Sequence, residues 1–227
     1  MRVEELAPGL WSWTTRHPEW DPTYAWAAEV RCFYVETDVA TLVVDPLVPH
    51  DDAARFWRAL DDDVERRRLP VAVLLTQAAH ARSAGEVATR YGAEVWGHEY
   101  AREKVGGARY RTIDAGATLP GGAGVLALDQ EPGGSATPLW FPSHRAVAVG
   151  DVLISVGGRL RIWWAHGASD ETWYRNRLVP SLRAWLDHPI EHVLVAHGGQ
   201  VAGGAAELAA ALERPPFGFG SAPSGNP

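Results

Sequence analysis

The sequence is poor in cysteine and has no long apolar run. It contains one cysteine, Cys32, among 227 residues, which excludes an intramolecular disulfide and any zinc module built on several cysteines. No window reaches the roughly 18 continuous apolar residues that a membrane span requires. The first residues, Met1–Glu5, are not followed by the apolar core of a signal peptide. We therefore expect a cytoplasmic protein without a membrane partner.

Positive charge is also scarce. The 21 Lys and Arg residues face 28 Asp and Glu residues, which gives a formal net charge of −7. A nucleic-acid partner is not expected, because phosphate binding needs a basic face. The basic cluster Arg66–Arg68 follows a run of acidic residues, a pattern typical of a solvated helix end. A small-molecule ligand is the partner that remains possible, and the sequence does not fix the oligomeric state.

The pattern of apolar residues predicts two successive halves, each made of strands followed by helices. Chain length and a hydrophobic content of 46% favour one domain over residues 1–214. The Gly, Pro and Ser content predicts a flexible tail over residues 215–227. The fold class that follows is α/β, an αββα sandwich of two mixed sheets flanked by helices. Strands are predicted at residues 10–15, 30–36, 40–44, 71–75, 93–96, 125–129, 138–141, 146–149 and 192–196, and helices from 51 and at 83–91, 172–186 and 205–212.

Five short motifs lie at the predicted strand ends or in turns. After the strand at 71–75 the chain reads Thr-Gln-Ala-Ala-His-Ala-Arg over residues 76–82, and Ser83 and Glu86 then have capping-box spacing at a helix start. The other four motifs are Val43-Val44-Asp45, Glu131-Pro132-Gly133-Gly134, Gly150-Asp151 and Ala196-His197-Gly198-Gly199.

The order and spacing of these motifs resemble the metallo-β-lactamase fold family, up to about Pro215. In that family the loop reads Thr-His-x-His-x-Asp-His and binds two zinc ions, and the later motifs supply further metal ligands. The resemblance implies the αββα sandwich and a hydrolase ancestry.

Most ligand positions implied by the resemblance hold residues that do not bind zinc. Gln77, Ala79, Ala81, Arg82 and Gly134 stand where the family places His, His, Asp, His and His. Alanine and glycine have no donor atom, and arginine stays protonated. Asp151 and His197 alone keep ligand-type side chains. A dinuclear zinc site and a cofactor are therefore not expected, and the candidate catalytic residues are His80, Arg82, Asp151 and His197.

Two hypotheses for the former metal pocket follow. In the first, the Arg82 guanidinium forms an ion pair with Asp151 in place of the metal, and the protein is a metal-free descendant that binds a small molecule or a partner. This hypothesis is favoured, because neighbouring residues on an extended loop point in opposite directions, so His80 is expected to face away from the old ligand positions.

In the second hypothesis His80, Asp151 and His197 hold one zinc or other divalent metal, or act as acid–base groups, in a hydrolase of altered mechanism. A serine hydrolase is disfavoured because no Gly-x-Ser-x-Gly elbow occurs. The sequence leaves open whether the protein is an enzyme.

Several aromatic residues fall on segments that border the active-site groove in the resembling family. Such side chains favour a flat apolar or sugar-like ligand. The alternative is that the rings pack these loops onto the sandwich. The candidate ligand-binding residues are Trp20, Trp26, Gln77, Trp163, Trp164 and His166.

Overall fold

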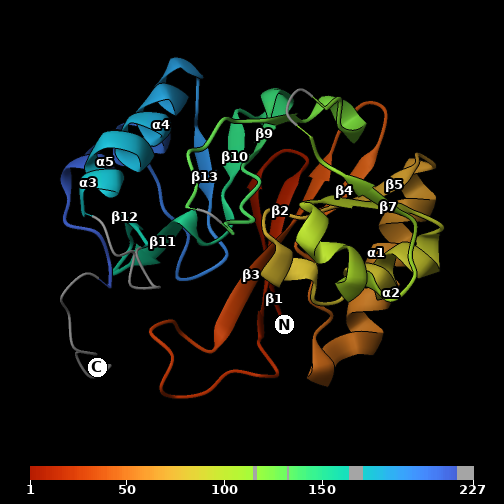
Figure 1. The fold of residues 1–227 in the computed structure, drawn as a ribbon. Coiled ribbons are helices and arrows are strands. Elements are labelled where there is room, and N and C mark those ends of the chain that lie inside the picture. The colour runs from red at the N-terminus through yellow and green to blue at the C-terminus, as the bar shows by residue number, and fades with distance from the viewer. Residues whose placement is uncertain (115–116, 132, 164–170, 219–227) are drawn as a thin grey trace.

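The computed structural model describes residues 1–114, 117–131, 133–163 and 171–218, and it confirms two mixed sheets with helices outside them (Figure 1). The first sheet has seven strands in sequence order, antiparallel from β1 to β4 and parallel from β4 to β7. These strands are β1 (Arg2–Ala7), β2 (Leu10–Arg16), β3 (Glu29–Glu36), β4 (Thr41–Val44), β5 (Val71–Leu74), β6 (Glu94–Gly97) and β7 (Tyr110–Thr112).

The second half of the chain forms a four-stranded sheet and a separate hairpin. The sheet has the order β13 (His192–Leu194), β10 (Ala146–Ala148), β9 (Leu139–Phe141) and β8 (Gly124–Val125), with β10 and β13 parallel. The hairpin pairs β11 (Leu153–Val156) with β12 (Arg159–Ile162). β8 is shorter than the predicted strand. Pro138, opposite Leu126, has no N–H with which to continue the ladder.

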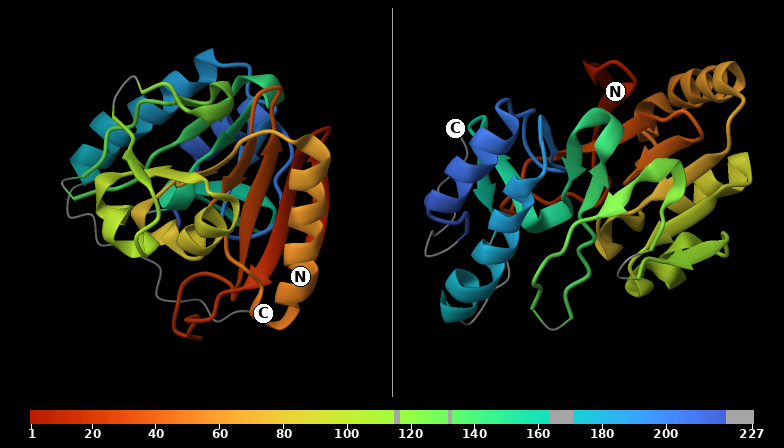
Figure 2. Two further views of the ribbon diagram at one scale, coloured as in Figure 1. Left: turned by 90° about the vertical axis from the view of Figure 1, so that its right-hand side faces the viewer. Right: turned by 90° about the horizontal axis from the view of Figure 1, so that it is seen from above.

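The helices lie on the outer faces of the two halves. Figure 2 shows α1 and α2 on the opposite side of the molecule from α4 and α5. The α-helical segments are α1 (Ala53–Arg67), α2 (Ala84–Tyr91), α3 (Glu171–Trp173), α4 (Val179–Ala184) and α5 (Gly204–Glu213). No helix within the described residues has the length and apolar content needed to cross a bilayer.

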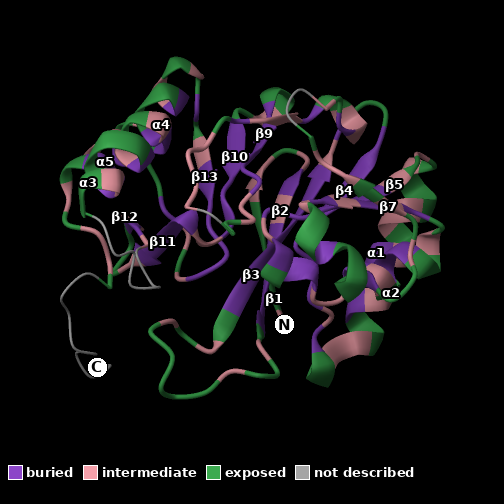
Figure 3. Ribbon diagram, viewed as in Figure 1, coloured by how far each residue is buried: buried purple, intermediate pink, exposed green. Residues whose placement is uncertain are grey.

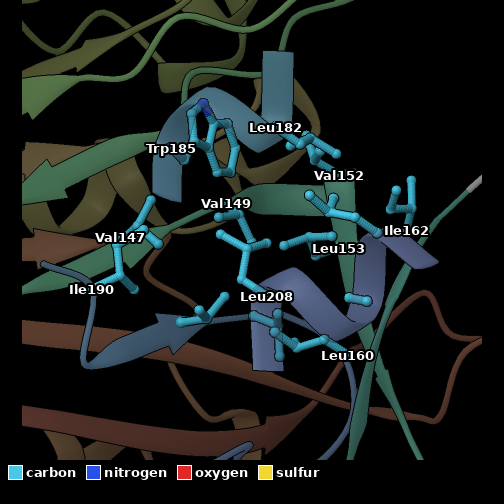
Figure 4. Close-up of a cluster of buried hydrophobic side chains, with 14 of the residues drawn as sticks. Val147, Val149, Val152, Leu153, Leu160, Ile162, Leu182, Trp185, Ile190 and Leu208 are labelled. Carbon is cyan, nitrogen blue, oxygen red and sulfur yellow. The ribbon is translucent and has the colours of Figure 1, made fainter. Parts of the chain in front are cut away.

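Three apolar clusters separate the four layers (Figure 3). β4 shows how the sequence builds them: Leu42 and Val44 face the other sheet, whereas Val43 between them faces the helices. This is the period of two that a strand buried on both faces requires. The cluster between the second sheet, the hairpin and its helices contains Trp185 and Leu208 (Figure 4).

Two predicted helix details are corrected by the structure. The Ser83 hydroxyl does not cap α2 but accepts a hydrogen bond from the backbone N–H of Val48 at 3.0 Å. The helix predicted at 172–186 contains a π-helical turn, Tyr174–Leu178, that joins α3 to α4. Pro180 has no N–H and its ring clashes with the preceding helical turn, which disfavours regular α-helix at this place.

Candidate functional site

The candidate site lies where four strands end. β4 and β5 are parallel neighbours in the first sheet, and β10 and β13 are parallel neighbours in the second. Since the carboxyl ends of parallel strands meet at one edge of a sheet, the side chains that follow them converge. Isolated bridges between Gln77 and Ala136 and between Val30 and His197 join the two halves at this place.

Three side chains meet at the centre of the site. Nε2 of His80 lies 3.2 Å from Oδ1 of Asp151, and Nε2 of His197 lies 3.1 Å from the same oxygen. All three atoms lie within 4.8 Å of one another. This oxygen of Asp151 is buried, and no group in the described part of the chain meets hydrogen-bond geometry toward it. The atoms therefore converge on a common point without bonding to one another, as metal ligands do.

A second carboxylate fixes the ring of His80 from behind. Oδ2 of Asp45 lies 2.9 Å from Nδ1 of His80, and Asp45 is only 1% exposed. The backbone N–H and the hydroxyl of Thr76 also donate to this carboxylate. Because a carboxylate only accepts, Nδ1 of His80 carries the proton, which directs the lone pair of neutral His80 from Nε2 toward Asp151. Sequence analysis missed this role of Asp45, since an aspartate after a strand is a common turn residue.

Gln77 holds Asp151 by two hydrogen bonds. The side-chain N–H of Gln77 donates a hydrogen bond to Oδ2 of Asp151 at 2.9 Å, and its side-chain oxygen Oε1 accepts one from the backbone N–H of Asp151 at 3.0 Å. This two-point contact satisfies one carboxylate oxygen and leaves the other turned toward the two histidines. Gln77 is thus a positioning residue for Asp151.

The three central groups shift one another's protonation. Burial raises the pKa of Asp151, but the adjacent imidazoles of His80 and His197 outweigh it and hold that pKa well below its usual value. Burial and the charge of Arg82 lower the pKa of His80, but the carboxylates of Asp151 and Asp45 give a net rise. Burial dominates at His197, so its pKa is lowered.

Solved structures with the same layers cover nearly the whole chain. DIM-1 metallo-β-lactamase superposes with a TM-score of 0.63 at 15% identity, over 93% of this chain and 95% of its own. The metallo-β-lactamase from Pontibacter korlensis has a TM-score of 0.64 at 14% identity, over 94% of this chain and 99% of its own. The chain has the metallo-β-lactamase fold.

The same fold occurs in larger proteins. The flavodiiron protein from Giardia intestinalis matches with a TM-score of 0.59 at 13% identity, and this chain spans 58% of its length. No protein-family model matches the sequence, and no curated protein is significantly similar to it. Likeness at such low identity establishes the fold, and the chemistry has to be argued from the site.

Within the metallo-β-lactamase fold, the three central residues fit one metal ion. Two ligands bound at about 2.0–2.1 Å to a tetrahedral zinc ion lie roughly 3.3 Å apart, close to the two separations observed at Asp151. Among the residues that the structure describes, His80, Asp151 and His197 are the group of three that could hold a metal. Gly134 stands at another ligand position of the resemblance. A Cβ there would lie 2.8 Å from Oε1 of Gln130, so a larger residue at this position would require Gln130 to move.

The expectation that His80 faces away from the site is wrong. Residues 78–81 form a short 3₁₀ helix instead of an extended loop. Side chains on such a turn do not alternate between two sides, so His80 points toward Asp151, although it lies between Ala79 and Ala81, two ligand positions of the resembling family. Its side chain is 3% exposed.

The ion pair predicted between Arg82 and Asp151 is also wrong. Nη1 of Arg82 lies 3.4 Å from the carbonyl oxygen of Asp45 and 3.9 Å from Sγ of Cys32. The backbone of Arg82, at φ 31°, turns the chain out of the 3₁₀ helix. The guanidinium consequently lies behind Asp45, and the described partners of Asp151 are His80, His197 and Gln77.

The predicted aromatic residues divide into three groups. Trp26 and Trp163 flank His197, with ring centroids 4.6 and 5.1 Å from the imidazole. Trp20 shapes the loop, since its indole N–H donates to the carbonyl oxygen of Trp26 at 2.8 Å. Trp164 and His166 lie outside the described residues. Trp26 and Trp163 therefore exclude water from one side of the site.

A pocket opens next to Asp151, on the side of the second sheet. Gln77, Asp151 and Trp163 contribute to its lining. Trp173, which falls within the helix predicted at 172–186, also lines it. This role of Trp173 was not predicted, because the direction of its side chain depends on the π-helical turn that follows it.

Proposed function

We propose that the protein binds a single divalent metal ion through His80, Asp151 and His197 and acts as a hydrolase. The observation that supports the proposal is the convergence of two imidazole nitrogens on a buried carboxylate oxygen that lacks a hydrogen bond. Two histidines and one carboxylate suit zinc, and three protein ligands leave a position for a substrate or a water molecule.

The chain's own residues prepare this site. A zinc ion in such a site supplies a lowered pKa for a water molecule that it binds. Asp45 fixes the tautomer and direction of His80, and Gln77 fixes Asp151. Trp26 and Trp163 shield His197 and keep the local dielectric constant low.

The proposed site holds one metal ion, whereas the resembling family binds two zinc ions. Ala79, Ala81 and Gly134 offer no donor atom for a second ion, and the amide of Gln77 is already engaged with Asp151. The sequence favoured a metal-free descendant of the fold, with an Arg82–Asp151 ion pair, because His80 was expected to face away from the ligand positions. Since His80 instead lies beside Asp151 and Arg82 contacts Asp45 and Cys32, the hypothesis with one metal is the better supported.

Metal analysis of protein purified without chelator tests the proposal. We expect about one zinc, iron or manganese ion per chain, and a rise in melting temperature when metal is added back after chelation. His80→Ala and His197→Ala should each lose the ion. His50→Ala, which removes a histidine that is 92% exposed, should retain it.

A protein that binds no divalent metal after reconstitution would contradict the proposal. It would support instead the metal-free protein that binds a small molecule or partner. Loss of metal in His50→Ala as readily as in His80→Ala would equally count against the assigned ligands.

A further inference from the structure

The pocket beside Asp151 has a volume of about 190 Å³ and a composition that restricts its ligand. It is lined by Gln77 after β5, by the segment between β8 and β9, by residues on either side of the β11–β12 hairpin, and by Trp173 of α3 and Leu178 of the π-helical turn. Its lining residues outside the metal cluster fall into acidic and apolar groups. Asp129 and Glu131 are acidic, and Trp163, Trp173 and Leu178 are apolar.

The charged groups of the lining are all negative. Asp129, Glu131 and Asp151 line it, and among the described lining residues there is neither lysine nor arginine. Asp151 faces two histidines, and Asp129 pairs with Arg177 at 2.9 Å. Glu131 is half-buried, and within the described part of the chain no ion pair joins it to a cation. The charge of Glu131 is therefore available to attract a cationic ligand.

The walls of the pocket are aromatic and offer one unsatisfied donor. The rings of Trp163 and Trp173 and the side chain of Leu178 line it. Nε1 of Trp163 is buried and has no hydrogen-bond partner among the residues that the structure describes. A buried donor without a partner is costly, so this N–H is suited to an oxygen of a ligand. Indole faces also attract cations, best where water is excluded.

We propose that this pocket binds the organic part of the substrate and selects a small ammonium compound with an apolar body. The ammonium group faces Glu131, the apolar body packs on the two indoles, and a substrate oxygen accepts from Trp163. A carboxylate ligand is disfavoured by repulsion from Glu131 and Asp151. This inference rests on the proposed function, because the pocket opens directly beside Asp151.

Three ligands of similar size test this selection by calorimetric titration at neutral pH and low salt. They are benzylamine (a cation at this pH), benzyl alcohol and benzoate, and each is measured with protein containing metal and with protein stripped of metal. We expect benzylamine to bind about three- to tenfold more tightly than benzyl alcohol, and benzoate to bind most weakly. Glu131→Gln should abolish the preference for the amine. Glu103→Gln, which removes the same charge from an exposed position, should leave it unchanged.

Equal binding of the amine and the alcohol, no binding of either, or an unchanged preference in Glu131→Gln would overturn the inference. The two proposals can fail separately. If the protein selects the amine but takes up no metal, the inference about the pocket stands and the proposed hydrolase function fails. If the protein binds metal but does not select the amine, the proposed function stands and the inference about the pocket fails.

Discussion

At the scale of single residues, Asp45 organises the site although it contacts no position where a metal or substrate would lie. Its buried carboxylate receives the ring N–H of His80 and both the backbone N–H and the hydroxyl of Thr76. It thereby ties the start of the 3₁₀ helix to the end of β4 and sets the direction of His80. Asp45 has a left-handed backbone, with φ 49°, which aspartate and asparagine tolerate better than most residues.

Replacing Asp45 by asparagine should weaken metal binding without unfolding the protein. The asparagine oxygen can still accept a hydrogen bond from Thr76. Its NH₂ group, however, cannot accept a hydrogen bond from the Nδ1–H group of His80. Loss of such a carboxylate–histidine contact reduces metal affinity by about 10- to 100-fold. Competition with a chromophoric chelator measures the affinity, and circular dichroism checks the fold. Unchanged affinity in a folded Asp45→Asn variant would show that Asp45 does not orient the ligand.

The sequence predicted the positions of the site residues better than their directions. Asp151 and His197 follow strands, so their convergence was predictable from parallel pairing. The direction of His80 was not, because it depends on whether residues 78–81 are extended or helical, and in so short a segment the helix propensity of alanine does not decide between the two. The ion pair of Arg82 was mispredicted for the same reason. The direction of the Arg82 side chain depends on its left-handed backbone conformation, which the sequence does not reveal.

At the scale of secondary structure, α5 is held to the hairpin by one carboxylate. Glu207 is 9% exposed and accepts hydrogen bonds from the backbone N–H of Leu160 and from the side chains of Arg159 and Arg214. The hydrogen bonds from Arg214 are the largest cause that lowers the pKa of Glu207, to about 2. The contact fixes the hairpin whose next residue, Trp163, forms a wall of the pocket.

The pH dependence of stability follows from this shift. Because the folded pKa of Glu207 is depressed from its usual 4.5 to about 2, its contribution is complete above about pH 4.5 and is lost as the pH falls toward 2. Glu207→Gln should destabilise the protein by about 1–2 kcal/mol at neutral pH and flatten this part of the acid unfolding profile. Denaturant titrations at several pH values measure both effects.

Glu213→Gln is a matched control on the same helix. Glu213 pairs with Arg183 at 2.7 Å, but both side chains are more than half exposed, so its loss should cost less than about 0.5 kcal/mol. Equal destabilisation by the two variants would mean that Glu207 contributes only as a surface charge.

Most elements were predictable because their periods are visible in the sequence. In the strands of the first sheet, apolar residues either alternate with polar ones or form continuous runs, as buried strands require. The helices α1 and α5 each have an apolar face. The π-helical turn was not predicted. The sequence contained its signal, since Pro180 stands in the middle of the helix predicted at 172–186.

At the scale of the whole molecule, the apolar layer between the sheets positions the site. Leu42 and Phe33 of the first sheet pack with Leu139 and Phe141 of the second in one buried cluster. His80 extends from the first half, and Asp151 and His197 extend from the second. The spacing of the metal ligands therefore depends on how the two sheets pack. The order of strands and helices allowed this architecture to be predicted from the sequence, whereas the contacts across the layer could not be.

Leu42→Ala should test this layer. Leu42 is completely buried, so its truncation leaves a cavity and should cost about 2–5 kcal/mol. Val39→Ala, at a side chain that is 63% exposed, should change stability by less than about 0.5 kcal/mol. Guanidinium unfolding of the two variants measures the difference. A cost at Leu42 no larger than at Val39 would show that the sheets are not held together through this cluster.

The division of the chain into two contiguous halves has a consequence for how the protein could be taken apart. A polypeptide cut in the connection between Thr112 and Gly124 would leave one imidazole on the first fragment and place the carboxylate and the other imidazole on the second. Neither fragment would own a complete set of donors. Uptake of an ion by a mixture of the two would then report that separately produced pieces had found each other and reassembled.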